Sequence, residues 1–268
     1  MTSSIDIIDL TFTYPDGTQA LTSVDLSIAA GEQVAIVGQN GSGKSTLVRQ
    51  FNGLLRPTAG SILIDGADAK NEHVAVLART VGLAFQNPDR QIFARSVRTE
   101  VSFGPRNLGR RGAVLDEAVD RALAVTGLDK EPNTNPYDLG YSRRKLLALA
   151  SILAMETPIV VLDEPTTGQD ARGVARIQSI VRWLHEAGRT VIAISHDMRF
   201  VAESFSRVVA MKAGTVVLDG PPAIVFGEAS WTTLASTYLE PTLAARVGAK
   251  LGVGSTPTEA ALIKALGG

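Results

Sequence analysis

The sequence predicts an α/β protein with a parallel core sheet, a small antiparallel β subdomain, a helical insertion and a C-terminal helical tail. Short, continuous apolar runs are typical of strands buried on both faces of a parallel sheet. Runs that alternate apolar and polar residues between Gly and Pro turns favour an antiparallel sheet instead. Continuous apolar runs that predict buried parallel strands occur four times, at Val34–Val37, Val81–Phe85, Ile159–Leu162 and Val191–Ile194.

The antiparallel strands are predicted near the N-terminus. Residues Ile5–Tyr14 and Val24–Ile28 alternate loosely, with Pro15-Asp16-Gly17 as turn chemistry between them. A further strand, Gly60–Asp65, ends at the turn signal Asp65-Gly66. We therefore expect a small sheet that packs on the parallel core.

A glycine-rich loop follows the first buried strand and precedes a predicted helix. It reads GQNGSGKST and fits the pattern G-x-x-x-x-G-K-[ST]. Its glycines let the backbone curl so that N–H groups converge on an anion. The hydroxyl of Ser45 is a hard oxygen suited to Mg²⁺. Lys44 would reach the β- and γ-phosphates of a nucleoside triphosphate. The residues expected to contact the nucleotide are Gly38, Asn40, Gly41, Ser42, Gly43, Lys44, Ser45 and Thr46.

Between about residues 88 and 158 the spacing predicts a helical insertion. Two apolar faces are expected there, one formed by Val114, Ala118, Ala122 and Val125 and the other by Leu146, Leu149, Ala150 and Leu153.

Beyond residue 220 the sequence predicts a helical tail over 221–268, after a first domain over 1–220. An apolar stripe is expected along Leu239, Leu243, Val247 and Leu251, which repeat every four residues. In Thr256-Pro257-Thr258-Glu259, Thr256 is the predicted helix cap, with proline at the first helical position and a capping-box glutamate.

Chemically useful side chains follow three of the buried strands. Asp163 and Glu164 come directly after one, Gln86 after another and His196 after a third. The carboxyl ends of parallel strands meet at one sheet edge, where ligands of open α/β sheets bind. Asp163 is expected to hold Mg²⁺, and Glu164 to polarise the attacking water. Tyr14 is expected to stack on a base, whereas His73 and His185 are expected to lie on the surface.

Composition narrows the class of partner. The formal net charge is −1, so the broad cationic surface of a nucleic-acid-binding protein is not expected. There is no cysteine, which excludes disulfides and thiol catalysis and fits a reducing compartment. No apolar run approaches the roughly 20 residues of a membrane span, and no signal peptide is expected.

These motifs together resemble the nucleotide-binding subunit of ATP-binding-cassette (ABC) transporters, over about Ile5 to Gly220. In that resemblance Gly38–Thr46 is Walker A, Ile159–Glu164 is Walker B and Gly168-Gln169-Asp170 is the D-loop. It implies ATP and Mg²⁺ as cofactors, with Tyr14 at the adenine and Ser45, Gln86 and Asp163 around the metal. Lys44, Gln86, Glu164 and His196 are then the catalytic candidates.

The segment Tyr14–Gly17, the stretch from Phe85 to Phe93 and the helical tail are similar to the ATPase subunits of energy-coupling-factor importers for vitamins, cobalt or nickel. This similarity implies a transmembrane coupling subunit and a substrate-binding membrane subunit as partners, no nucleic acid, and a location at the cytoplasmic face of the membrane. Residues from Asn87 to Phe93 and the helical insertion are the expected docking surface. Another ABC importer or exporter, a regulatory subunit that binds ATP without cleaving it, and a non-transport ABC ATPase are the alternatives.

One motif departs from the family pattern. Where Leu-Ser-Gly-Gly-Gln is expected before the long helix, this chain has Leu139-Gly140-Tyr141-Ser142-Arg143. The signature hydroxyl is missing at Gly140 and Tyr141 adds bulk, although Ser142 could substitute in part and Arg143 could attract an anion. Because each nucleotide in the family lies between one subunit's Walker A and the other's signature, we expect a second ATPase subunit with an intact signature. A working homodimer is the alternative.

Overall fold

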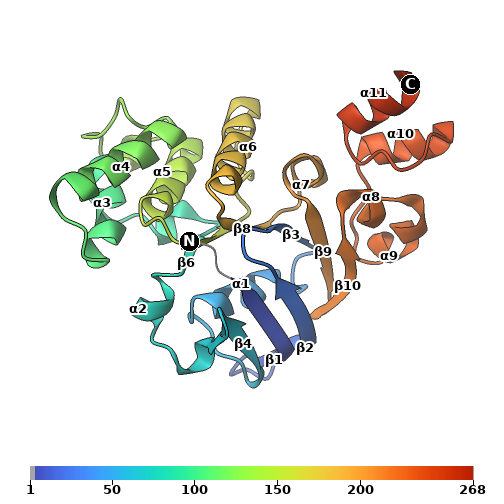
Figure 1. The fold of residues 1–268 in the computed structure, drawn as a ribbon, viewed down its shortest axis with the longest axis horizontal. Coiled ribbons are helices and arrows are strands. Elements are labelled where there is room, and N and C mark those ends of the chain that lie inside the picture. The colour runs from blue at the N-terminus through green and yellow to red at the C-terminus, as the bar shows by residue number, and fades with distance from the viewer. Residues whose placement is uncertain (1–3, 268) are drawn as a thin grey trace.

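A computed structural model describes residues 4–267 of the chain. Two sheets lie in the middle, a group of helices extends from one end, and the C-terminal tail lies at the other end (Figure 1).

The smaller sheet is antiparallel, with the strand order β2-β1-β4-β5. It confirms the predicted N-terminal strands and the turn between them. Ile5 pairs with Ile28 on one side and with Ile64 on the other, and all three side chains are buried. The strands are β1 (Ile5–Thr13), β2 (Gln19–Ile28), β4 (Ala59–Ile64) and β5 (Ala67–Asp68).

The larger sheet has the order β10-β9-β3-β8-β7-β6, and all neighbours are parallel except β10 and β9. The four predicted buried strands are confirmed as β3 (Gln33–Val37), β6 (Val81–Ala84), β7 (Ile159–Asp163) and β8 (Thr190–Ile194). The hairpin of β9 (Arg207–Lys212) and β10 (Thr215–Gly220) was not predicted, although Val208–Met211 is a further continuous apolar run.

Successive residues of the parallel strands face two different cores. In β7, Val160 and Leu162 pack with the helical side of the molecule, whereas Ile159 and Val161 pack with the antiparallel sheet. This explains why the run is apolar at every position. Helix α6 (Ala171–Glu186) covers the first face and α1 (Lys44–Phe51) the second.

The helical insertion consists of α3 (Val97–Asn107), α4 (Gly112–Thr126) and α5 (Tyr141–Leu153). All four apolar residues predicted for the second face are buried. On the first face the prediction was wrong at one end, because Val114 is 62% exposed and Leu115 packs inward instead. The remaining short elements before the tail are η1 (Ala69–Asn71), α2 (Val74–Leu77), η2 (Pro88–Arg90), η3 (Pro136–Asp138) and α7 (Met198–Ser204).

The tail is helical, and Leu239 of the predicted apolar stripe is buried, but the prediction was wrong within α10. In α10 the buried residues are Ala244, Ala245 and Gly248, while Leu243 is 75% and Leu251 56% exposed. A side chain at Gly248 would come 2.0 Å from the Thr256 Oγ1, so the small face must point inward. The elements are α8 (Pro222–Val225), η4 (Glu228–Ser230), α9 (Trp231–Ala235), α10 (Leu243–Leu251) and α11 (Glu259–Gly267).

The cap of the last helix was also misplaced by two residues. Helix α11 begins at Glu259, and Thr258 caps it by accepting from the Ala261 N–H at 3.1 Å. Thr256, the predicted cap, is buried and donates to the Ala244 carbonyl at 2.8 Å. Within residues 4–267, none of the helices combines the length and apolar character that a bilayer crossing requires.

Candidate nucleotide site

The glycine-rich loop connects the end of β3 to the start of α1, as the sequence predicted. Gly38 and Gly43 have φ angles of 149° and 101°. A Cβ atom at Gly38 would lie 2.3 Å from the Met211 carbonyl oxygen, and one at Gly43 would lie 2.6 Å from that of Ala20. Backbone conformation and space therefore both require glycine at these positions.

The unpredicted β9–β10 hairpin supports this loop from outside. The Gly214 N–H in the hairpin turn donates to the Ser42 carbonyl at 3.1 Å, and the Thr22 N–H donates to the Gly214 carbonyl at 3.0 Å. The hairpin thus joins the glycine-rich loop to the antiparallel sheet.

Lys44 lies almost completely buried at the centre of the loop, with 5% of its surface exposed. Its ammonium donates to the carbonyls of Gly38 at 2.7 Å and Gln39 at 2.8 Å. Burial lowers the pKa of Lys44, and the nearby Glu164 and Asp163 oppose this shift. Within the described residues, its ammonium makes bonds shorter than 3 Å only to the loop itself. Phosphate oxygens are better acceptors for that charge.

Asp163 ends strand β7 directly beneath the loop. The Ser45 hydroxyl donates to its Oδ1 at 3.4 Å. Burial raises the pKa of Asp163, while the hydrogen bond from Ser45 works against the rise. Among residues 4–267 no three His, Cys, Asp or Glu side chains gather to hold a metal ion. The predicted Mg²⁺ ligands contain only one carboxylate, with a hydroxyl and an amide as the others.

Glu164 follows Asp163 with a positive φ of 51°, which is unusual for a residue with a side chain. Its N–H donates to the Ile194 carbonyl at 2.9 Å, and its Oε2 accepts from the Thr167 hydroxyl at 3.3 Å. Its Oε1 lies 3.0 Å from the Nε2 of His196. That oxygen is buried and lacks a hydrogen bond of good geometry with any described residue.

The two side chains of this contact have pKa values shifted in opposite directions. Burial raises the pKa of Glu164, and burial together with the charge of Lys44 lowers the pKa of His196. His196 is therefore neutral near pH 7, and the contact is not an ion pair at that pH.

The predicted site residues meet in one groove of about 340 Å³. Tyr14 lies at one side, where its hydroxyl is 2.9 Å from that of Thr46, and Gln86 is exposed at another. Gly38 and Asp163 are not among the residues that line the groove. His73 and His185 are exposed elsewhere, as predicted. Of the predicted residues, the groove is lined by Tyr14, Asn40, Gly41, Ser42, Gly43, Lys44, Ser45, Thr46, Gln86, Glu164 and His196.

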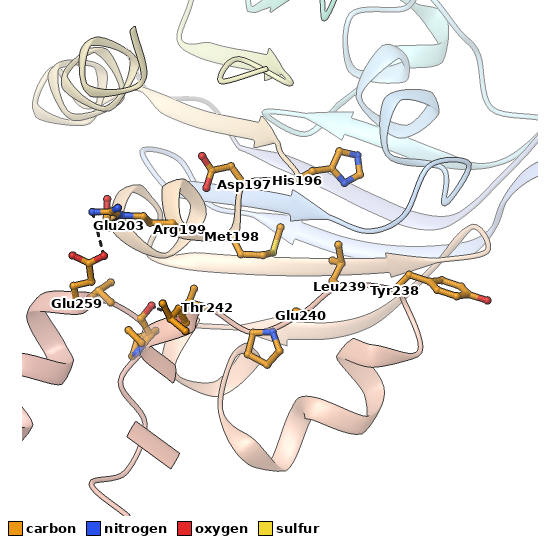
Figure 2. Close-up of a pocket in the computed structure, with 15 residues that line it drawn as sticks. His196, Asp197, Met198, Arg199, Glu203, Tyr238, Leu239, Glu240, Thr242 and Glu259 are labelled. Carbon is orange, nitrogen blue, oxygen red and sulfur yellow. Dashed lines mark hydrogen bonds and ion pairs between the residues drawn. The ribbon is translucent and has the colours of Figure 1, made fainter. Parts of the chain in front are cut away.

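A second cavity, of about 540 Å³, begins at His196 and extends between α7 and the C-terminal tail (Figure 2). Arg199 in α7 approaches Glu259 in α11 to 3.4 Å across it. The tail therefore lies beside the strand end that carries His196, a neighbourhood that the sequence did not indicate.

The altered signature segment lies at the start of α5 and is bound to its own chain. The Ser142 hydroxyl donates to Gln169 Oε1 at 2.6 Å, and Arg143 pairs with Glu131 at 2.6 Å. The Tyr141 ring covers Gly168, where a Cβ atom would come 2.7 Å from it. Lys145, which sequence reasoning did not single out, is buried and donates to the carbonyls of Glu164 and Thr167.

Comparison with known proteins gives consistent matches. Residues 21–167 match the ABC transporter family. The energy-coupling factor transporter ATP-binding protein EcfA of Methanothermobacter thermautotrophicus is 39% identical, over 88% of this chain and 76% of the relative. An ABC transporter ATP-binding protein of Methanosarcina acetivorans is 43% identical over 92% of this chain, which spans only 40% of that relative's length.

Solved structures give the same match. CbiO1 of Clostridium perfringens, part of the ABC transporter complex cbiONQ, superposes with a TM-score of 0.77 at 35% identity, covering 92% of this chain and 98% of that one. The ATP-binding cassette MJ0796, a dimer with ADP and Pi, superposes with a TM-score of 0.75 at 26% identity, covering 81% and 98%.

Proposed function

The chain belongs to the ABC transporter family, and on that premise we propose that it is the ATP-hydrolysing subunit of an energy-coupling-factor importer. The groove carries the proposal, because it brings the glycine-rich loop, Gln86, Glu164 and His196 together around one space. In this proposal residues 1–220 form the ATPase domain, with its helical subdomain over about 88–158, and residues 221–268 form the tail.

We assign the roles around the groove from its geometry. Glu164 lines the groove and accepts a hydrogen bond from the attacking water through its carboxylate. Neutral His196 lies 3.0 Å from that carboxylate, where it can contact the γ-phosphate. Lys44 and the loop N–H groups stabilise charge on the transferred phosphoryl group. Tyr14 contacts the adenine from the side of the groove.

The residues present also fit a Mg²⁺ ion. Ser45 and Asp163 are already close enough to share one cation, and Gln86 offers an amide oxygen from the adjacent strand end. A metal there would neutralise charge between the β- and γ-phosphates.

The partner in the proposed composite site is a second ATPase subunit with an intact signature. The altered signature supports this, since Ser142 and Arg143 are both bound within the chain. If instead the purified transporter contains two copies of this chain and both sites turn over, the heterodimer is wrong.

A transmembrane coupling subunit would dock beside Gln86, with a substrate-binding membrane subunit completing the complex at the cytoplasmic face of the membrane. A groove of about 610 Å³ lies there, lined by Leu54, Phe85 and Arg90 among others. Phe93 and Phe103 form an exposed aromatic pair on the neighbouring helical subdomain, with ring centroids 4.7 Å apart. Charge reversal at Arg90 tests this docking more cleanly than reversal at Asp89, which pairs with Arg144 at 3.1 Å.

The transported substrate would be a vitamin or a transition metal ion. This part of the proposal rests on the resemblance to energy-coupling-factor importers, in which the membrane subunits set the specificity for the substrate. Identification of the subunits and small molecule in the intact complex decides between this and another importer or exporter.

The central experiment is Glu164→Gln in the intact complex. We expect ATP hydrolysis to fall by about 10²–10⁴-fold while ATP still binds, because the amide cannot accept the water's proton. Glu186→Gln, an exposed carboxylate at the end of α6, is the matched control and should hydrolyse ATP normally. Normal turnover in Glu164→Gln would remove the role assigned to Glu164.

A further inference from the structure

The first turn of α5 is attached to the loop that carries Glu164. This loop, residues 164–169, lies between β7 and Asp170, the N-cap of α6, with Glu164 at one end and Gln169 at the other. Ser142 and Gln169 exchange two hydrogen bonds, Ser142 Oγ to Gln169 Oε1 at 2.6 Å and Gln169 Nε2 to the Ser142 carbonyl at 3.1 Å. Lys145 contacts the Glu164 end of the same loop.

Lys145 is a buried cation that has no role in the ATPase chemistry proposed above. Only 7% of its surface is exposed. Its ammonium donates to the carbonyl of Glu164 and, at 2.8 Å, to that of Thr167. An ammonium in such a position is costly unless its donors are satisfied, so these two bonds are its main compensation. Burial lowers the pKa of Lys145 to about 8, which reflects that cost.

The bond from Lys145 to the Glu164 carbonyl acts on a residue whose backbone conformation is unfavourable. Glu164 has a positive φ of 51°, a conformation that costs a residue with a side chain about 1–2 kcal/mol. It is maintained by bonds on both sides of the residue, from its own N–H to Ile194 and from Lys145 to its carbonyl. These bonds fix the peptide planes from which the side chain extends into the groove.

We propose that Lys145 is a positioning residue that holds the Glu164 carboxylate in its hydrolytic orientation by binding the main-chain carbonyls of Glu164 and Thr167. The inference rests on the proposed function, in which Glu164 acts on the attacking water. Lys145 also adds a second link between the start of α5 and this loop, next to the bonds that Ser142 of the altered signature segment makes with Gln169.

The test uses Lys145→Met in the intact complex with Mg²⁺ and ATP, because methionine keeps most of the length and removes every donor. We expect kcat to fall by about ten- to a hundredfold, the loss that a misplacement of about 1 Å produces. The KM for ATP should stay within about threefold, since the loop that binds phosphate is untouched. Lys145→Gln, whose amide can still donate, should lose less kcat than Lys145→Met.

A double mutant separates positioning from a general structural effect. In a Glu164→Gln background, Lys145→Met should change the residual single-turnover rate by less than about twofold, because the group that it positions is gone. An equal loss in both backgrounds overturns the inference, as does a kcat within twofold of wild type in folded Lys145→Met. If Lys145→Met does not fold, an unchanged kcat in Lys145→Gln overturns it, and at least a threefold loss at unchanged KM supports it.

Arg189 provides a matched control, because it binds the main chain at the start of β7 whereas Lys145 binds it just after the end of β7. It is a half-buried cation that donates to the Thr157 carbonyl at 2.5 Å, two residues before β7 begins. Arg189→Met should lower thermal stability but leave kcat within about twofold. If Glu164→Gln hydrolyses ATP normally, the proposed function fails; if Glu164→Gln is inactive and Lys145→Met is fully active, only this inference fails.

Discussion

The proposed composite site would use two helix N-termini of this chain, those of α1 and α5, and the two differ in how their side chains are bonded. Before α1, residues 40–43 line an open groove, and within the described residues the close contacts of the Lys44 ammonium are to the carbonyls of Gly38 and Gln39. At the start of α5, the side chains of Ser142, Arg143 and Lys145 all bind other parts of this chain.

The difference indicates which half of a shared site this chain can supply. The loop before α1 borders an open groove that a phosphate can enter, and loops of this kind bind anions through main-chain N–H groups. The first turn of α5 has used its side-chain donors to attach the loop 164–169 and the residue Glu131. The comparison therefore supports a chain that provides the catalytic half and relies on a partner for the other.

The largest effect is expected from adding one carbon to the loop before α1. Gly43→Ala should lower the free energy of unfolding by about 2 kcal/mol, because φ is 101° and the new Cβ would lie 2.6 Å from a main-chain oxygen. ATP affinity should fall at least about tenfold as the loop shifts. Thermal unfolding and equilibrium dialysis with ATP measure the two effects.

The control is the same substitution at the other helix. Gly140→Ala should change stability by only about 0.5 kcal/mol, because a Cβ there meets nothing within 4 Å. Equal losses at Gly43 and Gly140 would contradict the contrast between the two helix starts.

A smaller effect is expected from the bonds that hold α5 to the loop 164–169. Ser142→Ala, Gln169→Ala and the double variant form a cycle whose coupling free energy should be about 1 kcal/mol, the net value of such hydrogen bonds. Denaturant unfolding of the four proteins measures it. Additive losses would mean that the two side chains do not depend on one another in solution.

The sequence was sufficient to predict features that depend only on residues close together in the chain. The glycine-rich loop and the pair Asp163-Glu164 each stand directly after a continuous apolar run, so strand, edge and function could be predicted together. The run Val208–Met211 carried the same signal and was missed.

Features that depend on contacts between distant segments could not be predicted. Lysine in a helix is usually solvated, and nothing near Lys145 in the sequence shows that Glu164 and Thr167 lie beside it. In the tail, large apolar residues repeat every four positions, yet the close contact of Gly248 with Thr256 selects the face with small residues. Periodicity alone does not say which face can approach a neighbour.

The smallest effect is expected from restoring the missing signature hydroxyl, with Gly140→Ser. The position is open and is the N-cap of α5, where glycine offers no side-chain bond. A serine there should accept from the N–H of Arg143, three residues on, and raise the free energy of unfolding by a few tenths of a kcal/mol. Its hydroxyl would then be engaged by its own helix, and Tyr141 would still cover Gly168, so the ATPase rate of the intact complex should change by less than about twofold. A large gain in rate, measured at saturating ATP, would show instead that the absent hydroxyl was the main defect of this half of the site and that the bonds within the chain do not prevent it from contacting phosphate.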